Sequence, residues 1–253
     1  MNILILGGTS EANLIAESLA GEARFVVTLS LAGRTVSPRL PPVATRTGGF
    51  GGFEGLAAYL RAGRIAAVID ATHPFATRIS ANAAAATKLA GIPLIALERP
   101  AWTPVAGDRW TLVANIEAAA AALPDRAECV LLTVGRQSLA PFAAKPQHHY
   151  VIRVIDPPDI PPQLRDVEIV TGRGPFQRDD EIVTMREHRI DRLVSKNSGG
   201  EGSYAKLAVA RALGLPVILV QRPLRTGDSS VQTTEQVLHA LNLLHADLAK
   251  RSV

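Results

Sequence analysis

Short apolar runs separated by polar loops recur along the whole chain. In the first half these runs predict β-strands over residues 3–6, 25–31, 65–69 and 93–97. Between them, apolar residues at helical spacing predict helices, at 14–19, 53–61 and 76–90. Strands that are apolar throughout, without alternation, are typical of a parallel sheet covered on both faces. The first half is therefore predicted to be doubly wound α/β.

The second half has the same alternation of strands and helices. Apolar runs predict strands over 129–134, 150–155, 190–194 and 216–220, and helical spacing predicts helices over 116–123, after Tyr204, and along a final amphipathic segment. Residues 102–109 are predicted to link the halves. Residues 36–52 are rich in proline and glycine and lack periodicity, so this segment is predicted to be a long loop.

Two stretches about 125 residues apart follow one pattern. Each has a strand, a polar loop, a helix and a second strand that ends in Arg-Pro, at 65–100 and again at 190–223. This repeat predicts two Rossmann-like doubly wound parallel-sheet domains, residues 1–104 and 105–253, with a functional cleft between them.

Composition narrows the class of protein. The chain has 253 residues, of which 47% are hydrophobic and 20% charged, as expected for a soluble globular protein. No apolar stretch approaches the ~20 residues of a membrane span, no secretory leader is evident, and Cys129, the single cysteine, has no internal disulfide partner. We therefore expect a cytoplasmic protein with no membrane partner, and the sequence leaves its oligomeric state undecided.

The net charge of +4 comes mostly from scattered arginines. There is no basic stripe, and aromatic residues make up only 4%, so a nucleic-acid partner is not expected. Arginine binds carboxylate and phosphate groups bidentately, which favours a small polyanionic ligand. A solvated basic surface is the alternative.

A glycine loop follows the first strand, where doubly wound folds bind phosphate. It contains Gly7, Gly8, Thr9 and Ser10, whose backbone N–H and hydroxyl groups suit an anion at a helix N-terminus. The match to G-x-G-x-x-G is partial. The alternative is an ordinary helix start, with a Thr or Ser cap and Glu11 complementing the helix dipole.

The end of the second strand indicates which dinucleotide is bound. An NAD site usually presents an acidic residue there, whereas this chain offers Ser30 and Arg34 and no acid nearby. Arg34 can bind a 2′-phosphate, so NADPH is the predicted cofactor. Gly48, Gly49 and Thr72 complete the predicted cofactor-binding set.

Two polar loops at strand ends carry candidate chemistry. His73 titrates near neutrality and is a candidate to bind a carboxylate or move a proton, although a His before Pro is equally suited to a structural role. Lys196, Asn197, Ser198, Gly199 and Gly200 have the composition of an anion cradle, with a glycine-rich turn as the alternative. No metal site is predicted.

Five motifs in order along the chain resemble the precorrin-6A reductases of cobalamin biosynthesis. They lie at residues 6–12, 70–76, 98–102, 172–176 and 196–200. The resemblance implies an NADPH-dependent reductase that converts precorrin-6A to a dihydro-precorrin-6B. It also implies two α/β domains with cofactor and substrate between them. The loops of the two halves differ in chemistry, so we expect the first half to bind mainly NADPH and the second mainly the tetrapyrrole substrate.

A precorrin carries many carboxylates, so basic residues in loops and at strand ends become candidates for substrate binding. The predicted substrate-binding residues are His73, Arg99, Arg136, Arg173, Lys196, Asn197, Ser198, Gly199, Gly200 and Arg222. His73 and Lys196 are the catalytic candidates, and the sequence leaves open whether one of them or water supplies the proton. A non-catalytic dinucleotide sensor, or an NADPH reductase of another acidic metabolite, remains as an alternative. The residues leave open whether the substrate contains cobalt.

Overall fold

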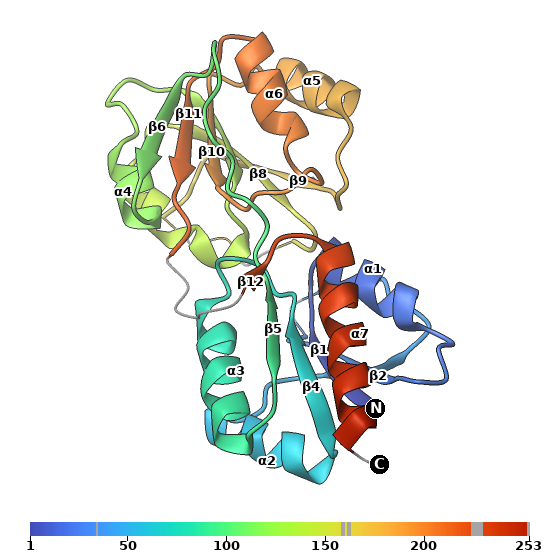
Figure 1. Cartoon of the computed structure of the whole chain (residues 1–253). Coiled ribbons are helices and arrows are strands. Elements are labelled where there is room, and N and C mark those ends of the chain that lie inside the picture. The colour runs from blue at the N-terminus through green and yellow to red at the C-terminus, as the bar shows by residue number, and fades with distance from the viewer. Residues whose placement is uncertain (34, 158–159, 161–162, 224–229, 252–253) are drawn as a thin grey trace. The chain divides into compact units, whose positions relative to one another are not determined.

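The computed structural model describes residues 1–33, 35–157, 160, 163–223 and 230–251 (Figure 1). The chain divides into two compact units. The first unit comprises Met1–Pro100 with Leu224–Val253, and the second comprises Ala101–Pro223. Within the described residues, each unit contains one six-stranded sheet whose neighbouring strands are all parallel.

The sheet of the first unit has the strand order β12-β5-β4-β1-β2-β3. Its strands are β1 (Asn2–Leu6), β2 (Val26–Leu31), β3 (Ala44–Thr47), β4 (Ile65–Asp70), β5 (Leu94–Leu97) and β12 (Ser230–Val231). Its helices are α1 (Ser10–Leu19), α2 (Phe53–Ala62), α3 (Thr77–Ala90) and α7 (Thr234–Arg251). Helices cover both faces of this sheet, which is the predicted doubly wound arrangement (Figure 1).

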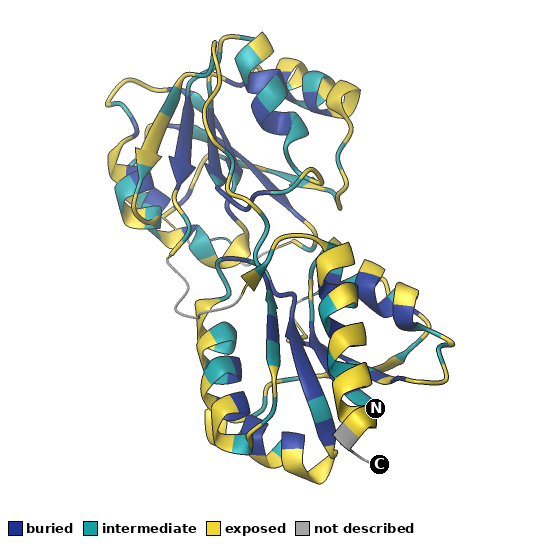
Figure 2. Ribbon diagram, in the orientation of Figure 1, coloured by how far each residue is buried: buried dark blue, intermediate teal, exposed yellow. Residues whose placement is uncertain are grey.

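Side chains of the central strand β1 alternate between two cores. Ile3 and Ile5 pack in the core that α1 and α7 cover, whereas Leu4 and Leu6 pack in the core that α2 and α3 cover. All four side chains are at most 1% exposed, and buried residues dominate the central strands (Figure 2). Burial on both faces explains why this strand is apolar at every position.

The sheet of the second unit has the strand order β6-β11-β10-β7-β8-β9. Its strands are β6 (Trp110–Val113), β7 (Cys129–Thr133), β8 (His149–Val154), β9 (Val167–Thr171), β10 (Arg192–Lys196) and β11 (Val217–Val220). Its helices are α4 (Ile116–Ala121), α5 (Arg178–Glu187) and α6 (Ala205–Ala212), with 3-10 helices η1 (Arg136–Ser138) and η2 (Ala140–Ala144). Met185 of α5 and Leu207 of α6 pack in one core with Leu131 of β7.

The predicted repeat is confirmed in the topology. Superposing the two strand orders pairs β1 with β7, β2 with β8, β3 with β9, β4 with β10 and β5 with β11. The loops after β3 and its counterpart β9 begin alike. Gly48 N donates to Leu31 O at 2.9 Å, and Gly172 N donates to Val154 O at 2.9 Å. The fold class of two Rossmann-like units is therefore shown, while the predicted cleft between them stays a prediction.

The structure corrects the predicted domain boundaries. The first unit ends at Pro100, close to the predicted boundary after residue 104, but α7 belongs to the first unit. Val237 and Leu241 of α7 are fully buried against the core of β1. β6 and α4 follow β5 in the chain, but β6 pairs with β11 and both elements belong to the second unit. β12 and α7 follow β11, but β12 pairs with β5 and both elements belong to the first unit. Each unit is thus completed by the strand and helix that follow the other unit's equivalent strand, an exchange of elements between the units.

The segment 36–52 was predicted to be a loop, and it contains the edge strand β3. An edge strand contacts a single neighbour, and β3 has no buried residue, so it lacks the apolar run that marks the central strands. No helix among the described residues is long and apolar enough to cross a membrane.

Candidate functional site

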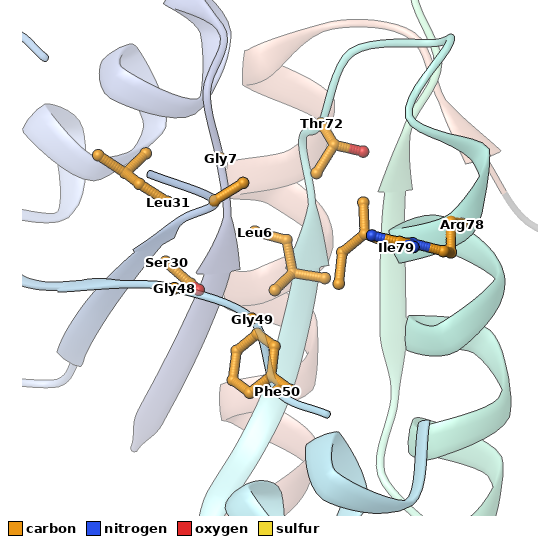
Figure 3. A pocket seen from close by; sticks show the side chains of 11 residues that line it. Leu6, Gly7, Ser30, Leu31, Gly48, Gly49, Phe50, Thr72, Arg78 and Ile79 are labelled. Atoms are coloured by element: carbon orange, nitrogen blue, oxygen red, sulfur yellow. The ribbon is translucent and has the colours of Figure 1, made fainter. Parts of the chain in front are cut away.

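A hollow of about 220 Å³ lies in the first unit, at the carboxyl ends of its strands (Figure 3). The lining comes from the ends of β1 and β2, the loops after β3 and β4, and the first turn of α3. The lining residues are Leu6, Gly7, Ser30, Leu31, Ala32, Gly48, Gly49, Phe50, Thr72, Arg78 and Ile79. Ligands of open α/β sheets bind at this edge, beside the point where the strand order reverses.

The turn after β1 is closely packed. Gly7 N donates to Ser30 O at 3.0 Å, and a Cβ on Gly7 would lie 2.6 Å from the Leu29 side chain. Gly8 has a φ of +107°, which L side chains rarely adopt. Gly7 thus lets the backbone line the hollow, and Gly8 lets the chain turn directly into α1.

Thr9 serves as the N-cap of α1. Its hydroxyl accepts a hydrogen bond from Ala12 N at 3.1 Å and donates one to Ala71 O at 2.6 Å. The first contact satisfies a helix N–H, and the second ties the glycine turn to the loop after β4. Thr9 therefore has the capping role that the alternative interpretation of this loop predicts, and neither it nor Gly8 nor Ser10 lines the hollow.

Glu11 and Arg99 form a part-buried ion pair. Arg99 Nη1 lies 2.5 Å from Glu11 Oε1. Burial pulls the pKa of the Glu11 carboxyl upward, but the hydrogen bond and the charge of Arg99 outweigh burial and leave that pKa below its ordinary value. The acidic residue beside the glycine turn is thus neutralised within the protein, which reduces its repulsion of a nearby phosphate.

Arg46 of β3 braces one wall of the hollow, and sequence reasoning did not select it. Its guanidinium donates to Ser30 Oγ at 2.7 Å and to the carbonyls of Gly48 and Gly49 at 3.1 Å each. It also lies 3.9 Å from the ring centre of Phe50. Arg46 therefore fixes the glycine loop that lines the hollow. The predicted phosphate ligand Arg34 lies outside the described residues.

The loop after β4 is held by hydrogen bonds to the buried Asp70. Asp70 Oδ1 accepts hydrogen bonds from Thr72 N at 3.1 Å and from Thr72 Oγ1 at 2.6 Å. His73 Nδ1 accepts from Phe75 N at 3.2 Å, so a neutral His73 carries its proton on Nε2. His73 thus has a fixed tautomer, whose neutral form donates through Nε2.

Arg78 lines the hollow from the first turn of α3 and is exposed. Among the lining residues that the structure describes, it is the one cation, and sequence reasoning missed it. Its position directly after the polar loop 70–76 was the available signal, because side chains in the first turn of such a helix face the carboxyl edge of the sheet.

The loop after β10 in the second unit is tied to Trp102. The Asn197 side chain accepts from Trp102 N and donates to Trp102 O, both at 2.9 Å, and Trp102 Nε1 donates to Gly200 O at 2.7 Å. Lys196 Nζ donates to Ser138 Oγ at 2.9 Å. Asn197 therefore shapes the loop with both ends of its amide, while Lys196 lies at the end of its strand beside η1.

The predicted residues fall into two groups by unit. The first unit contains all of the described cofactor candidates, together with His73 and Arg99. The second unit contains the remaining substrate candidates: Arg136, Arg173, Lys196, Asn197, Ser198, Gly199, Gly200 and Arg222. Arg136 and Arg173 are exposed and Arg222 is half-buried.

Nucleophilic or metal chemistry finds no support among the described residues. They contain no group of three or more His, Cys, Asp or Glu side chains arranged to hold a metal ion. Burial, with smaller contributions from nearby acids, raises the pKa of the Cys129 thiol to about 11, and its sulfur donates to His188 O at 3.1 Å. A thiol in that state is a poor nucleophile.

Parallel sheets with helices on both faces, a glycine turn after β1 and a hollow at the strand ends define a Rossmann-like α/β protein. Comparison with known proteins identifies the family. The family described as precorrin-6x reductase CbiJ/CobK matches residues 2–242, and the chain belongs to it.

Relatives support this assignment over nearly full length. A precorrin-6A reductase from Sinorhizobium sp is 48% identical over 239 residues, which cover 94% of this chain and 92% of the relative. A cobalt-precorrin-6A reductase from Priestia megaterium is 28% identical and covers 94% of this chain and 97% of the relative. The solved structure of CobK precorrin-6A reductase superposes with a TM-score of 0.92 at 47% identity, covering 96% of this chain and 97% of that one.

Proposed function

We propose that this protein reduces precorrin-6A to a dihydro-precorrin-6B in cobalamin biosynthesis, with NADPH as the reductant. The observation that carries the proposal is the 48% identity to a precorrin-6A reductase across 94% of the chain. Identity to the relative named for a cobalt-containing substrate is only 28%, which favours the cobalt-free precorrin. As a member of a biosynthetic family, the protein is expected to act in the cytoplasm.

The hollow in the first unit is the proposed NADPH site. NADPH supplies the hydride, and the chain contributes binding and orientation. Gly7, Gly48 and Gly49 offer close backbone approach, and Arg78 offers a cation to the phosphates. Arg34 remains the candidate for the 2′-phosphate on sequence grounds.

Substrate binding is proposed for the basic and polar residues at strand ends of the second unit, with Arg99 and His73 of the first. Arg136, Arg173, Lys196 and Arg222 supply cations that match the carboxylates of an acidic macrocycle. Reduction also needs a proton at the acceptor. His73, whose neutral form donates through Nε2, and Lys196 are the proposed donors.

NADPH oxidation followed at 340 nm with a panel of precorrin intermediates tests this function. We expect turnover with precorrin-6A and none with NADPH alone. Binding of NADPH without turnover on any member of the panel is the behaviour of a dinucleotide sensor and would refute the proposal.

The cofactor and proton assignments have separate tests. Arg34→Ala should raise the KM for NADPH far more than that for NADH, and equal effects would remove Arg34 from the site. His73→Gln should lower kcat about 100-fold and alter its pH profile if His73 is the donor. An unchanged kcat and pH profile would exclude His73 and leave Lys196 or water as the proton donor.

A further inference from the structure

Three charged side chains are buried together in the second unit. Arg153 of β8 donates from Nη1 to Glu181 Oε2 of α5 at 2.8 Å, and these side chains are 7% and 0% exposed. Lys206 of α6 is 3% exposed, donates to Ser203 O at 2.6 Å and interacts electrostatically with both partners. Burying three charges is costly, so this cluster is a specific feature of the unit.

The cluster lies where the first unit has its hollow. Leu31 O and Val154 O accept the equivalent hydrogen bonds from Gly48 N and Gly172 N. Ser30 directly precedes Leu31 and Arg153 directly precedes Val154, so Arg153 is the counterpart of Ser30. Arg78 is the second residue of α3, which follows β4. Lys206 is the second residue of α6, which follows the equivalent strand β10. Ser30 and Arg78 line a hollow, whereas Arg153 and Lys206 are both buried, with 8% and 3% of their surface exposed.

Arg153 also holds the loop at residues 172–176. Its guanidinium lies 4.0 Å from the ring centre of Phe176, a contact like that between Arg46 and Phe50 in the first unit. Phe176 N in turn donates to Gly202 O at 3.3 Å. The 172–176 loop is therefore attached both to the cluster and to the loop that precedes α6.

Lys206 connects the cluster with the loop at residues 196–203. Its ammonium lies 4.9 Å from the ring centre of Trp102, whose indole N–H binds Gly200 O. Its hydrogen bond to Ser203 O holds the other end of the same loop. The three side chains thus brace the loop that carries Arg173 and the loop that carries residues 196–200, all proposed to bind substrate.

We propose that Arg153, Glu181 and Lys206 are positioning residues for the acidic substrate. They occupy the second unit's counterpart of the dinucleotide hollow, so this unit takes no dinucleotide. They also fix the 172–176 and 196–203 loops in the arrangement that receives the macrocycle's carboxylates. This inference rests on the proposed function, and its test separates the two.

The test compares the full-length protein with two variants and a control. A triple variant, Arg153→Met with Glu181→Met and Lys206→Met, removes all three charges and leaves none unpaired, so the fold should survive. Glu181→Gln is a second variant that keeps the side-chain volume and a neutral acceptor for Arg153 but removes the cluster's one negative charge. Lys145→Met removes an ion pair with the exposed Asp125 in the same unit and serves as the control.

We expect the triple variant to raise the KM for precorrin-6A about tenfold or more while the Kd for NADPH changes less than about twofold. Glu181→Gln should raise KM in the same direction by a smaller factor, and the control should match the wild type. Hydrogen exchange in peptides covering 171–177 and 197–204 should become faster in both variants.

An unchanged KM, or equal changes in KM and in the NADPH Kd, would overturn the positioning role. If the wild type fails to oxidise NADPH with any precorrin, the proposed function fails on its own. Hydrogen exchange then decides the inference: faster exchange in both loops supports it, and exchange equal to that of the control overturns it.

Discussion

The turn after β1 requires glycine at position 7, because there is no room for a side chain there. A Cβ there would meet Leu29 Cδ1 at 2.6 Å and Ala12 Cβ at 3.3 Å, both parts of a packed core. We expect Gly7→Ala to destabilise the protein by about 1–3 kcal/mol, the usual cost of overpacking, and to weaken NADPH binding.

Gly49→Ala is the matched control for Gly7→Ala. A Cβ on Gly49 meets nothing within 4 Å, and its φ is not in the left-handed region, so its stability should stay near that of the wild type. The added methyl group would enter the proposed NADPH site and should weaken binding alone. Urea unfolding and NADPH titration separate these outcomes, and a Gly7→Ala variant as stable as Gly49→Ala would contradict the packing argument.

Lys206 makes the stability of the protein depend on pH. Burial first, and then the charge of Arg153, lower the pKa of Lys206 to about 7, with Glu181 opposing them. The unfolded chain has an ordinary lysine pKa of about 10.4, so between these values the unfolded state binds more protons and the folded state gains stability as pH rises. That gain is absent below pH 7, where both states are charged.

Comparison with Lys206→Met isolates this effect. Between pH 7 and pH 9 the wild type should gain about 2 kcal/mol of unfolding free energy relative to the variant, a value reduced from the full linkage for relaxation around the buried group. Urea unfolding at both pH values measures the difference. Parallel pH dependence in the two proteins would show that Lys206 has an ordinary pKa.

At the scale of elements, α7 is the helix most distant in sequence from the unit that it completes. Val237 and Leu241 are fully buried in the core around β1, whereas Leu243 is 59% exposed. Leu241→Ala should therefore cost about 2–5 kcal/mol of unfolding free energy, as for other buried leucines, and Leu243→Ala should cost little.

The same pair of variants tests where α7 belongs. If α7 stabilises the first unit, Leu241→Ala should weaken NADPH binding near its unfolding midpoint, because the proposed site lies in that unit. Unfolding followed by NADPH fluorescence and by far-ultraviolet circular dichroism measures both effects. Equal stability of the two variants would contradict the packing of α7 on β1.

Central elements were predictable from the sequence because burial on two faces leaves a continuous apolar run. β1, β4 and β7 coincide with such runs to within a residue, and β10 overlaps the predicted strand at 190–194 through Leu193 and Val194. The edge strands β3 and β9 were missed, since β3 has no buried residue and β9 likewise has none. Hydrophobicity marks burial, and edge strands of these sheets are poorly buried.

The site was predictable only in part, for a related reason. Glycine patterns and strand ends indicated Gly7, Ser30, Gly48, Gly49 and Thr72, all of which line the hollow. Arg78 and Arg46 gave no pattern, because their roles depend on which loops the sheet brings together. Thr9 and Asn197 are polar residues that bind the protein's own backbone, and composition does not distinguish this role from ligand binding.

The exchange of β12 and α7 was also beyond sequence reasoning. β5 and β11 are both apolar strands of four residues, and in each case Arg-Pro follows one residue later. The two strands therefore offer similar edges to an incoming parallel strand. Hydrophobic periodicity predicts that a segment is a strand or a helix, but it does not select between two similar edges.

At the scale of the whole molecule, the two units are alike in topology and differ in what lies at the ends of their strands. The first has a hollow at its strand ends, and the second has a charged cluster at the equivalent place. We therefore expect one NADPH to bind per chain. Calorimetric titration of the full-length protein measures the stoichiometry, and a value near two would show that the second unit also accepts a dinucleotide.

The exchanged elements also affect the order in which the protein can form during synthesis. The second unit is continuous, Ala101–Pro223, and all of its strands have been made once the ribosome passes residue 223. The first unit begins the chain but still lacks β12 and α7, whose core residues Val237 and Leu241 follow later. Domains usually fold from the N-terminus onward during synthesis, which proceeds at about 5–20 residues per second. Here the nascent chain would complete its second unit first, leaving the Val237 and Leu241 contact face of the first unit exposed for some seconds longer.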